Sequence, residues 1–193
     1  MDSKQAILEA ATQLISEKGE QLSGITVRDI CRRAGVGLGL VNYYFGSKDA
    51  LIDQCVERII NGIVAKFADI REKTDTLPPM EKLLFLGDMT FTFLFEHEAV
   101  SRISVLSDLA HPKEDDNTHR TFTAYLPLVA ACRPAWSEKK VQEKTFYLIT
   151  LMQQSFLRHR QISTLMDIDF SDSAQRSAYH KKIVEQILGE EAK

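Results

Sequence analysis

Apolar residues recur at helical spacing along almost the whole chain, and this periodicity constrains the fold more than any other feature. Near the N-terminus, Ile7, Leu8, Ala11, Leu14 and Ile15 follow a three- and four-residue rhythm, which places them on one stripe of a helix. The sequence contains no long apolar–polar alternation with period two and no Asn-Gly hairpin turn. It therefore predicts an all-α protein.

Glycines, prolines and capping residues divide this pattern into nine expected helices. They cover residues 3–18, 26–34, 38–45, a long segment from 47 to 67, 80–98, 99–110, a segment through 125–129 that stops near Pro134, 137–161 and 174–188. The chain of 193 residues is long enough for one large or two small domains.

Composition indicates a soluble protein of the cytoplasm. The chain is 44% hydrophobic and 26% charged, and no apolar run reaches the roughly 20 residues of a membrane span. The N-terminus has helical periodicity and lacks the pattern of a secretory signal. The three cysteines, Cys31, Cys55 and Cys132, fit neither a disulfide framework nor a zinc site, so we expect small buried apolar side chains. Oxidation of Cys55 as a trigger is the alternative.

Charge and motifs exclude simple functional assignments. The net charge is −3, so bulk charge gives no sign of nucleic-acid binding, and any DNA contact must use locally placed cations. No phosphate-binding glycine loop, H-E-x-x-H sequence or nucleophile elbow is present, so we expect no enzyme, no catalytic residues and no cofactor. Asp115 and His119, four residues apart in a polar loop, raise the option of a metal. A solvated loop whose acidic residues favour the start of the next helix fits better, so we expect no metal site.

Residues 35–51, GVGLGLVNYYFGSKDAL, are unusual for a helical chain. Each glycine costs about 1 kcal/mol against alanine in a helix interior, and three adjacent aromatics do not suit a solvated surface. A glycine turn between two short helices, from Thr26 to Phe45, predicts a helix-turn-helix. Val36, Val41 and Phe45 are expected to face inward.

The opposite face of the expected recognition helix carries groups that suit DNA. Asn42 can make paired hydrogen bonds to adenine, and Leu38 or Leu40 can pack on a thymine methyl. The tyrosine hydroxyls and Lys48 can reach phosphates, and the glycines allow a close approach. The alternative is that Tyr43 and Tyr44 line a protein interface.

Residues 25–52, ITVRDICRRAGVGLGLVNYYFGSKDALI, resemble the DNA-binding signature of the TetR family of bacterial transcriptional regulators. Thr26-Val27 opens the second helix, Ala34-Gly35-Val36 turns it, Tyr44-Phe45 closes the third and Ser47-Lys48 starts the fourth. The remainder agrees only in length, helix count and helix order. The resemblance implies a helix-turn-helix DNA-binding domain at 1–47 and a helical ligand-binding and dimerisation domain at 48–193.

The resemblance also implies a function and a set of contacts. The expected protein is a homodimeric repressor that binds a palindromic operator and is released by a small-molecule inducer; an activator, or an interaction module that does not bind DNA, is the alternative. The expected DNA-binding residues are Thr26, Arg28, Gly37, Leu38, Leu40, Asn42, Tyr43, Tyr44 and Lys48. In the family, polar residues are frequent where Gly37, Leu38 and Leu40 stand, so the individual base contacts stay open.

Two further sites are expected in the second domain. The dimer interface is assigned to Phe146, Ile149, Phe156, Tyr179, Ile183 and Ile187. An apolar or aromatic inducer is assigned to Phe67, Phe91, Phe95, Phe122, Tyr125, Met152 and Phe156, with His97, Arg102 and His159 as possible polar anchors. The alternative for both sets is that these side chains form the core of one subunit.

Overall fold

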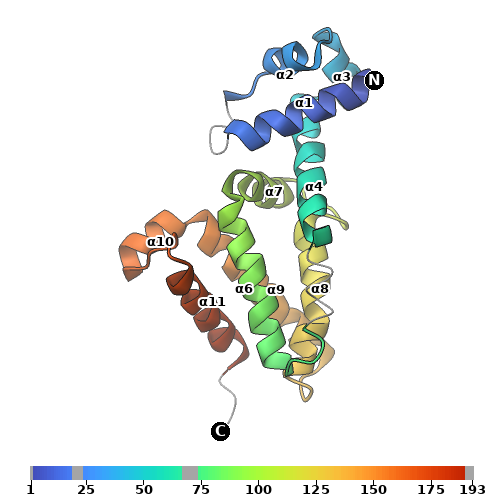
Figure 1. The fold of residues 1–193 in the computed structure, drawn as a ribbon. Coiled ribbons are helices and arrows are strands. Elements are labelled where there is room, and N and C mark those ends of the chain that lie inside the picture. Colours follow the sequence, from blue (N-terminus) through green and yellow to red (C-terminus); the bar gives the residue numbers. More distant parts are fainter. Residues whose placement is uncertain (1, 19–23, 67–73, 190–193) are drawn as a thin grey trace. The chain divides into compact units, whose positions relative to one another are not determined.

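The computed structural model describes residues 2–18, 24–66 and 74–189, and all regular structure in these ranges is helical (Figure 1). The helices are α1 (Ser3–Lys18), α2 (Val27–Ala34), α3 (Gly39–Phe45), α4 (Lys48–Lys66), α6 (Pro79–Glu96), α7 (Glu98–Ala110), α8 (Asn117–Cys132), α9 (Glu138–Leu157), α10 (His159–Met166) and α11 (Ser173–Leu188). The expected all-α class is confirmed, and the helix bounds agree with the sequence pattern except at one point.

The exception is the expected helix 137–161, which is two helices. α9 ends at Leu157 and α10 begins at His159, because Arg158 leaves the helical conformation with φ −111° and ψ 17°. Nδ1 of His159 donates to the Phe156 carbonyl at 2.8 Å, which satisfies an acceptor freed at this helix end. No glycine or proline marks the break, so apolar spacing alone could not place it. The part of the chain that the structure describes thus holds ten helices rather than nine.

The chain divides into two compact units by packing. Unit 1 combines Met1–Ala68 with Glu98–Ala110, and unit 2 combines Asp69–His97 with His111–Lys193. Unit 1 therefore holds α1 to α4 together with α7, which packs against α4. The functional division into 1–47 and 48–193 stays a prediction.

Unit 1 has a core built mainly on α1. This helix packs against α2, α3 and α4, so the three short N-terminal helices and the start of α4 share one apolar interior. The fully buried side chains there include Ile7, Ala11, Ile15, Ile25, Ile30, Val41, Leu51 and Cys55. The expectation of buried cysteines is confirmed for Cys31 and Cys55, and burial raises the pKa of both thiols.

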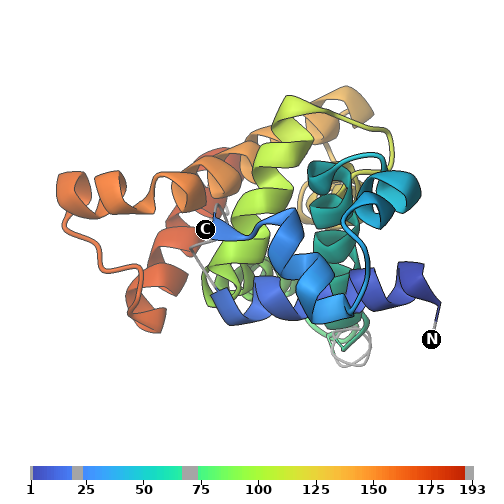
Figure 2. The same ribbon diagram turned by 90° about the horizontal axis from the view of Figure 1, so that it is seen from above.

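Unit 2 is a packed group of long helices. α8 packs against α6 and α9, and α11 packs against α6 and α9. Both Figures 1 and 2 show α11 beside α6, with α10 at the edge of the unit. The core cluster includes Leu83, Phe91, Tyr125, Val129, Leu148, Ile149, Met152, Phe170, Ile183 and Val184. Among the helices described, none is long and apolar enough to cross a membrane.

Candidate nucleic-acid interface

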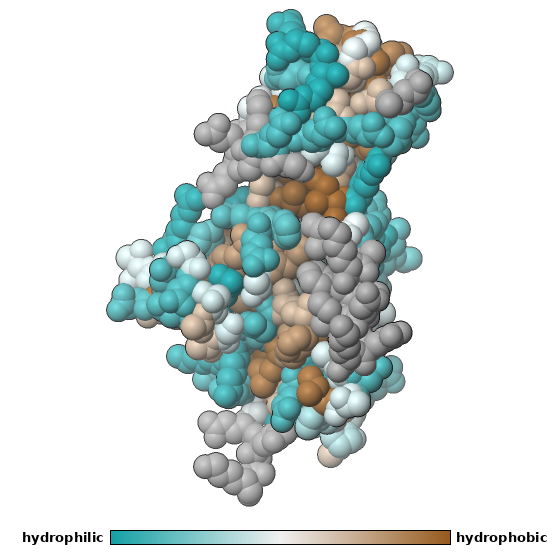
Figure 3. All heavy atoms as spheres, viewed as in Figure 1, coloured by the Kyte–Doolittle hydropathy of each residue, from teal (hydrophilic) through white to brown (hydrophobic). Residues whose placement is uncertain are grey.

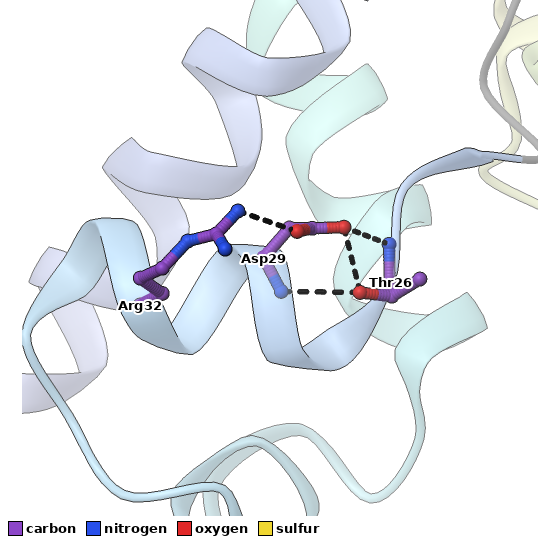
Figure 4. Close-up of polar contacts among 3 residues, drawn as sticks. All are labelled: Thr26, Asp29 and Arg32. Atoms are coloured by element: carbon purple, nitrogen blue, oxygen red, sulfur yellow. Dashed lines mark hydrogen bonds and ion pairs between the residues drawn. The ribbon is translucent and has the colours of Figure 1, made fainter.

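A reciprocal capping box fixes the start of α2 (Figure 4). The Asp29 N–H donates to Thr26 Oγ1 at 3.1 Å, and the Thr26 N–H donates back to Asp29 Oδ2 at 3.2 Å. The Thr26 hydroxyl itself donates to the same Oδ2 at 2.6 Å. Thr26 therefore caps the helix as predicted, but its hydroxyl proton is engaged and is not free for a phosphate. Asp29 was missed, although the T-x-x-D spacing was its signal.

The turn after α2 depends on a left-handed glycine. Gly35 has φ 68°, and its N–H donates to the Arg32 carbonyl at 3.4 Å while the Val36 N–H donates to the Cys31 carbonyl at 3.0 Å. These two bonds form a Schellman motif, which ends the helix and redirects the chain toward α3. A Cβ at Gly35 would meet no atom within 4 Å, so backbone conformation alone requires the glycine.

α3 buries one face and exposes the other. Val41 and Phe45 are buried, and Val36 before the helix is half-buried. On the other side, Tyr43 is 77% exposed and Leu38 is 53% exposed. Gly37, Gly39 and Asn42 are also exposed, and Leu40 and Tyr44 are half-buried. The structure thus brings the predicted contact residues of this helix onto one accessible face.

The structure of unit 1 does not require glycine at two positions of this face. A Cβ at Gly37 or Gly39 would meet nothing within 4 Å, and neither residue has a positive φ. α3 also lacks a side-chain cap, since Leu38 at the cap position makes no such bond. Neither internal packing nor backbone strain therefore explains these glycines. Glycine at these positions permits a close approach of another molecule to the backbone.

The cations near this face differ in their pairing. Arg32 pairs with Asp29 at 2.8 Å and Arg33 pairs with Glu17 at 2.7 Å, so both are engaged within unit 1. Arg28 is exposed and Lys48 half-buried, and neither forms an ion pair with a residue that the structure describes. Lys48 opens α4, whose start is capped by Ser47 Oγ accepting from the Ala50 N–H at 3.1 Å.

The surface over this part of unit 1 is divided. Figure 3 shows hydrophobic atoms gathered at the end where α3 lies, next to hydrophilic atoms over α2. The two adjacent rings of Tyr43 and Tyr44 meet edge to face with centroids 4.9 Å apart. An apolar and aromatic ridge flanked by charged groups can enter a groove and contact base edges while the flanks hold phosphates.

The residues expected to contact an inducer fall into two groups. Rings of Phe91, Phe95 and Phe156 lie together, with centroids 5.2 Å apart for the first pair and 5.4 Å for Phe95 and Phe156. Tyr125 and Met152 are buried in the same core cluster. Phe122 is half-buried, with His119 6.5 Å away. Phe67 lies outside the described residues. Sequence reasoning missed Phe170, Arg176 and His180, which adjoin the first group.

The residues expected at a dimer interface are divided between core and surface. Ile149, Phe156 and Ile183 are buried in unit 2, and Tyr179 and Ile187 pack partly buried against that core. Phe146 is 59% exposed. Tyr147 and Leu151 on the same helix are also exposed, and Tyr147 was missed. The available apolar surface of α9 is therefore narrower than the sequence pattern indicated.

The polar loop 111–119 acts as a helix start. Asp116 Oδ1 accepts from the His119 N–H at 2.7 Å, and Oδ2 accepts from the Lys113 N–H at 2.9 Å. Asp116 is thus the cap of α8. In the described parts of the chain, no group of three His, Cys, Asp or Glu side chains is placed to hold a metal ion.

The family described as "Bacterial regulatory proteins, tetR family" matches residues 7–55. The HTH-type transcriptional repressor KstR2 of Mycobacterium tuberculosis is 31% identical over 93 residues, 48% of this chain and 44% of that protein. The chain therefore spans less than half the length of this relative.

Solved structures match the chain over nearly its whole length. A TetR transcriptional regulator from Rhodococcus sp. RHA1 gives a TM-score of 0.60 at 17% identity, with 98% of both chains covered. A TetR-like transcriptional regulator from the same organism gives 0.58 at 16% identity, with 97% of both chains covered. At these identities the likeness is one of fold, and it confirms the expected architecture.

Proposed function

We propose that the chain is a ligand-responsive DNA-binding transcriptional regulator of the TetR family, a repressor that binds a palindromic operator as a homodimer. The proposal is supported by the match of residues 7–55 to the family model, by the similarity to a repressor over about half of the chain and by the shared fold. The observation that carries the proposal is the exposed face of α3. Its glycines serve no purpose within unit 1, and its Asn42 and Tyr43 side chains stand free to meet base edges. Such a regulator acts in the cytoplasm, where the chromosome lies.

The proposed contacts follow from exposure and pairing. Asn42 reads a base edge in the major groove, with Leu38, Leu40 and Tyr43 beside it. Arg28 and Lys48 hold phosphates, because neither forms an ion pair with a residue that the structure describes. Tyr44 and the backbone at Gly37 flank these contacts. Thr26 contributes by fixing α2, and it contacts a phosphate only if its hydroxyl leaves Asp29.

A homodimer supplies two recognition helices for two half-sites. Successive major grooves on one side of the duplex lie about 34–36 Å apart, so the dimer must hold its two recognition helices at that spacing. The exposed apolar face of α9 around Phe146 supports a contact between copies. In one state of the dimer the spacing of the recognition helices fits DNA, and in the other it does not. A ligand that binds unit 2 more tightly in the second state lowers operator affinity, at most by its ratio of affinities for the two states.

The direct test is selection of genomic DNA fragments with the purified full-length protein. The proposal expects enrichment of a near-palindromic site, whose neighbouring genes then identify the regulated functions. Enrichment of no sequence by the wild-type protein would contradict the proposal and favour an α3 that serves a protein partner. A reporter placed behind the enriched site distinguishes repression from activation.

A further inference from the structure

α11 buries an arginine without a carboxylate partner. Arg176 is only 6% exposed and forms no ion pair with a residue that the structure describes. Its Nη1 donates to the Phe170 carbonyl at 2.8 Å, and its Cζ lies 5.6 Å from the centroid of the Phe95 ring. Its Nε is buried and has no hydrogen-bond partner. The guanidinium therefore has unused hydrogen-bonding capacity on its Nε side.

Such an arrangement is costly for a ligand-free core. An arginine keeps its charge, and a buried charge needs an opposite charge or a full set of hydrogen bonds. One carbonyl and one aromatic face compensate only part of this cost. Well-packed apolar residues of similar volume would give a core at least as stable. The guanidinium is therefore explained best by an anion that arrives from outside the chain.

Aromatic rings surround this group. Phe170 stacks on Phe95 with centroids 5.3 Å apart and ring planes at 5°, and Phe91 meets Phe95 edge to face at 5.2 Å. Phe91 also stacks with Tyr179 at 6.4 Å. These rings come from α6, α11 and the segment before α11, so they form a continuous apolar seam. They suit a ligand whose body is apolar, with one charged end.

A second unpaired group lies one turn along α11. His180 is 1% exposed, and its Nε2 has no hydrogen-bond partner. Its ring sits against the backbone of α6 at Gly87, where a Cβ would come within 2.6 Å of Nε2 and Cε1. Burial lowers the pKa of His180 to about 4, against the opposing effect of the nearby Asp88 carboxylate. The imidazole is therefore neutral near neutral pH, and its Nε2 can form one further hydrogen bond.

The charges along the seam orient the ligand. Asp88 Oδ1 is buried without a hydrogen-bond partner near His180, so this end of the seam repels an anion. Asp169 and Asp172 lie close to Arg176 in sequence, but they accept from the N–H groups of Ser171 and of Ala174 and Gln175. At the Phe95 end, Arg176 places a permanent positive charge against the rings.

We propose that the seam between α6 and α11 binds the inducer, and that the inducer is a monocarboxylate with an apolar body whose carboxylate is held by Arg176. The carboxylate accepts two hydrogen bonds from Nε and Nη2 in the fork that arginine presents, and the body lies among the rings of Phe91, Phe95 and Phe170. This inference rests on the proposed function, because it names the ligand class of that regulator.

The test compares charged and neutral probes with the full-length protein. The probes are 4-phenylbutyrate and octanoate, each beside its neutral alcohol, 4-phenylbutan-1-ol and octan-1-ol. Calorimetric titration should show binding of both carboxylates to the wild type and binding at least tenfold weaker for the alcohols. Absence of carboxylate binding, or equal binding of the alcohols, would overturn the inference.

Variants locate the site. Arg176→Met should lose carboxylate affinity at least tenfold, and Arg176→Lys should fall between it and the wild type because lysine lacks the fork. Arg160→Met, on exposed α10, is the matched control and should bind as the wild type does. A merely structural Arg176 predicts the reverse pattern: Arg176→Met has a lower melting temperature but keeps the wild-type affinity for the carboxylates. The inference predicts an unchanged or higher melting temperature for ligand-free Arg176→Met.

DNA binding separates failure of this inference from failure of the proposed function. Where wild-type protein binds an operator fragment and 4-phenylbutyrate weakens that binding in the wild type but not in Arg176→Met, both stand. Where DNA binds but neither carboxylate does, the ligand class is wrong and the regulator remains. Where DNA does not bind at all, the proposed function fails, whatever the carboxylates do.

Discussion

The Thr26 hydroxyl donates a hydrogen bond to the Asp29 carboxylate at 2.6 Å. This bond makes Thr26 part of the cap of α2, and its hydroxyl proton is engaged without any DNA contact. The same carboxylate accepts from the Thr26 N–H and pairs with Arg32, so Asp29 joins the first and last turns of α2. The position of α2 sets the turn at Gly35, and that turn sets the exposed face of α3. The proposed DNA-binding surface therefore depends on a capping box that is not itself part of it.

Removing the cap should lower stability more than it changes contacts. We expect Thr26→Ala to reduce the free energy of unfolding by about 1 kcal/mol, because the Asp29 N–H loses its acceptor. Thr26→Ser should retain most of that stability. Urea denaturation monitored by circular dichroism measures the difference. A Thr26→Ala protein with wild-type stability and no DNA affinity would instead make Thr26 a phosphate ligand.

The three glycines before and within α3 should respond differently to alanine. Gly35→Ala should destabilise the protein by about 1–2 kcal/mol, because its φ of 68° is unfavourable for a residue with a Cβ. Gly39→Ala should leave stability unchanged or raise it by up to about 1 kcal/mol, since alanine favours the helix and its Cβ meets open space. Gly37→Ala should leave stability unchanged.

The same glycine variants test the close approach to DNA. Gly37→Ala and Gly39→Ala should both weaken operator binding despite their intact stability. Chemical denaturation and fluorescence anisotropy on one preparation give the two quantities. Full operator affinity in both variants would show that the glycines do not mark the DNA contact.

Burial of His180 should make stability depend on pH. Its pKa is lowered to about 4, whereas an unfolded histidine titrates near 6.5. Between about pH 4 and 6.5 the imidazole of His180 is protonated in the unfolded chain but not in the folded chain. The contribution of His180 to the free energy of unfolding is therefore complete above about pH 6.5 and decreases as pH falls toward 4. The decrease attributable to this group is on the order of 3 kcal/mol.

The His180→Gln variant isolates this contribution. Its free energy of unfolding should fall less steeply than that of the wild type between about pH 6.5 and 4, as measured by denaturant titrations at a series of pH values. His111→Gln, at an exposed position of the loop before α8, should keep the wild-type slope. Identical slopes for His180→Gln and the wild type would contradict the burial of a neutral imidazole.

The exposed ring of Phe146 should support the contact between copies. Phe146→Ser removes its apolar surface from α9, and we expect the dimer to dissociate at concentrations where the wild type stays dimeric. Leu165→Ser is the matched control, because Leu165 is still more exposed but lies on α10. Sedimentation velocity measures the populations. Dissociation of the Leu165→Ser protein with an intact Phe146→Ser dimer would move the interface to α10.

Local sequence signals were enough to predict the helix-turn-helix of unit 1. Thr26, Gly35, Ser47 and the spacing of Val41 and Phe45 act within a few residues of their own positions, so cap, turn and buried face could be read directly. The helix break at Arg158 was missed because it depends on a side chain closing onto a nearby carbonyl, with no glycine or proline to mark it. Apolar spacing there predicts a longer helix than forms.

The features of unit 2 that matter most could not be predicted. The fit of His180 against Gly87 and the position of Arg176 over Phe95 join residues some eighty or more positions apart in sequence. Periodicity placed Ile149 and Ile183 on apolar faces, but it could not show whether those faces meet their own subunit or a partner. Tertiary packing decides this, and it assigns both side chains to the core.

The most direct test of DNA recognition by α3 is the salt dependence of operator binding for the wild type, Asn42→Ala and Lys48→Gln. Fluorescence anisotropy across a salt series should show steep weakening for the wild type, a log–log slope reduced by about 1 for Lys48→Gln, and an unchanged slope with lost discrimination between operator and random DNA for Asn42→Ala. Lys139→Gln on α9 should match the wild type. Salt-independent binding, or an Asn42→Ala protein that still discriminates the operator, would contradict the account.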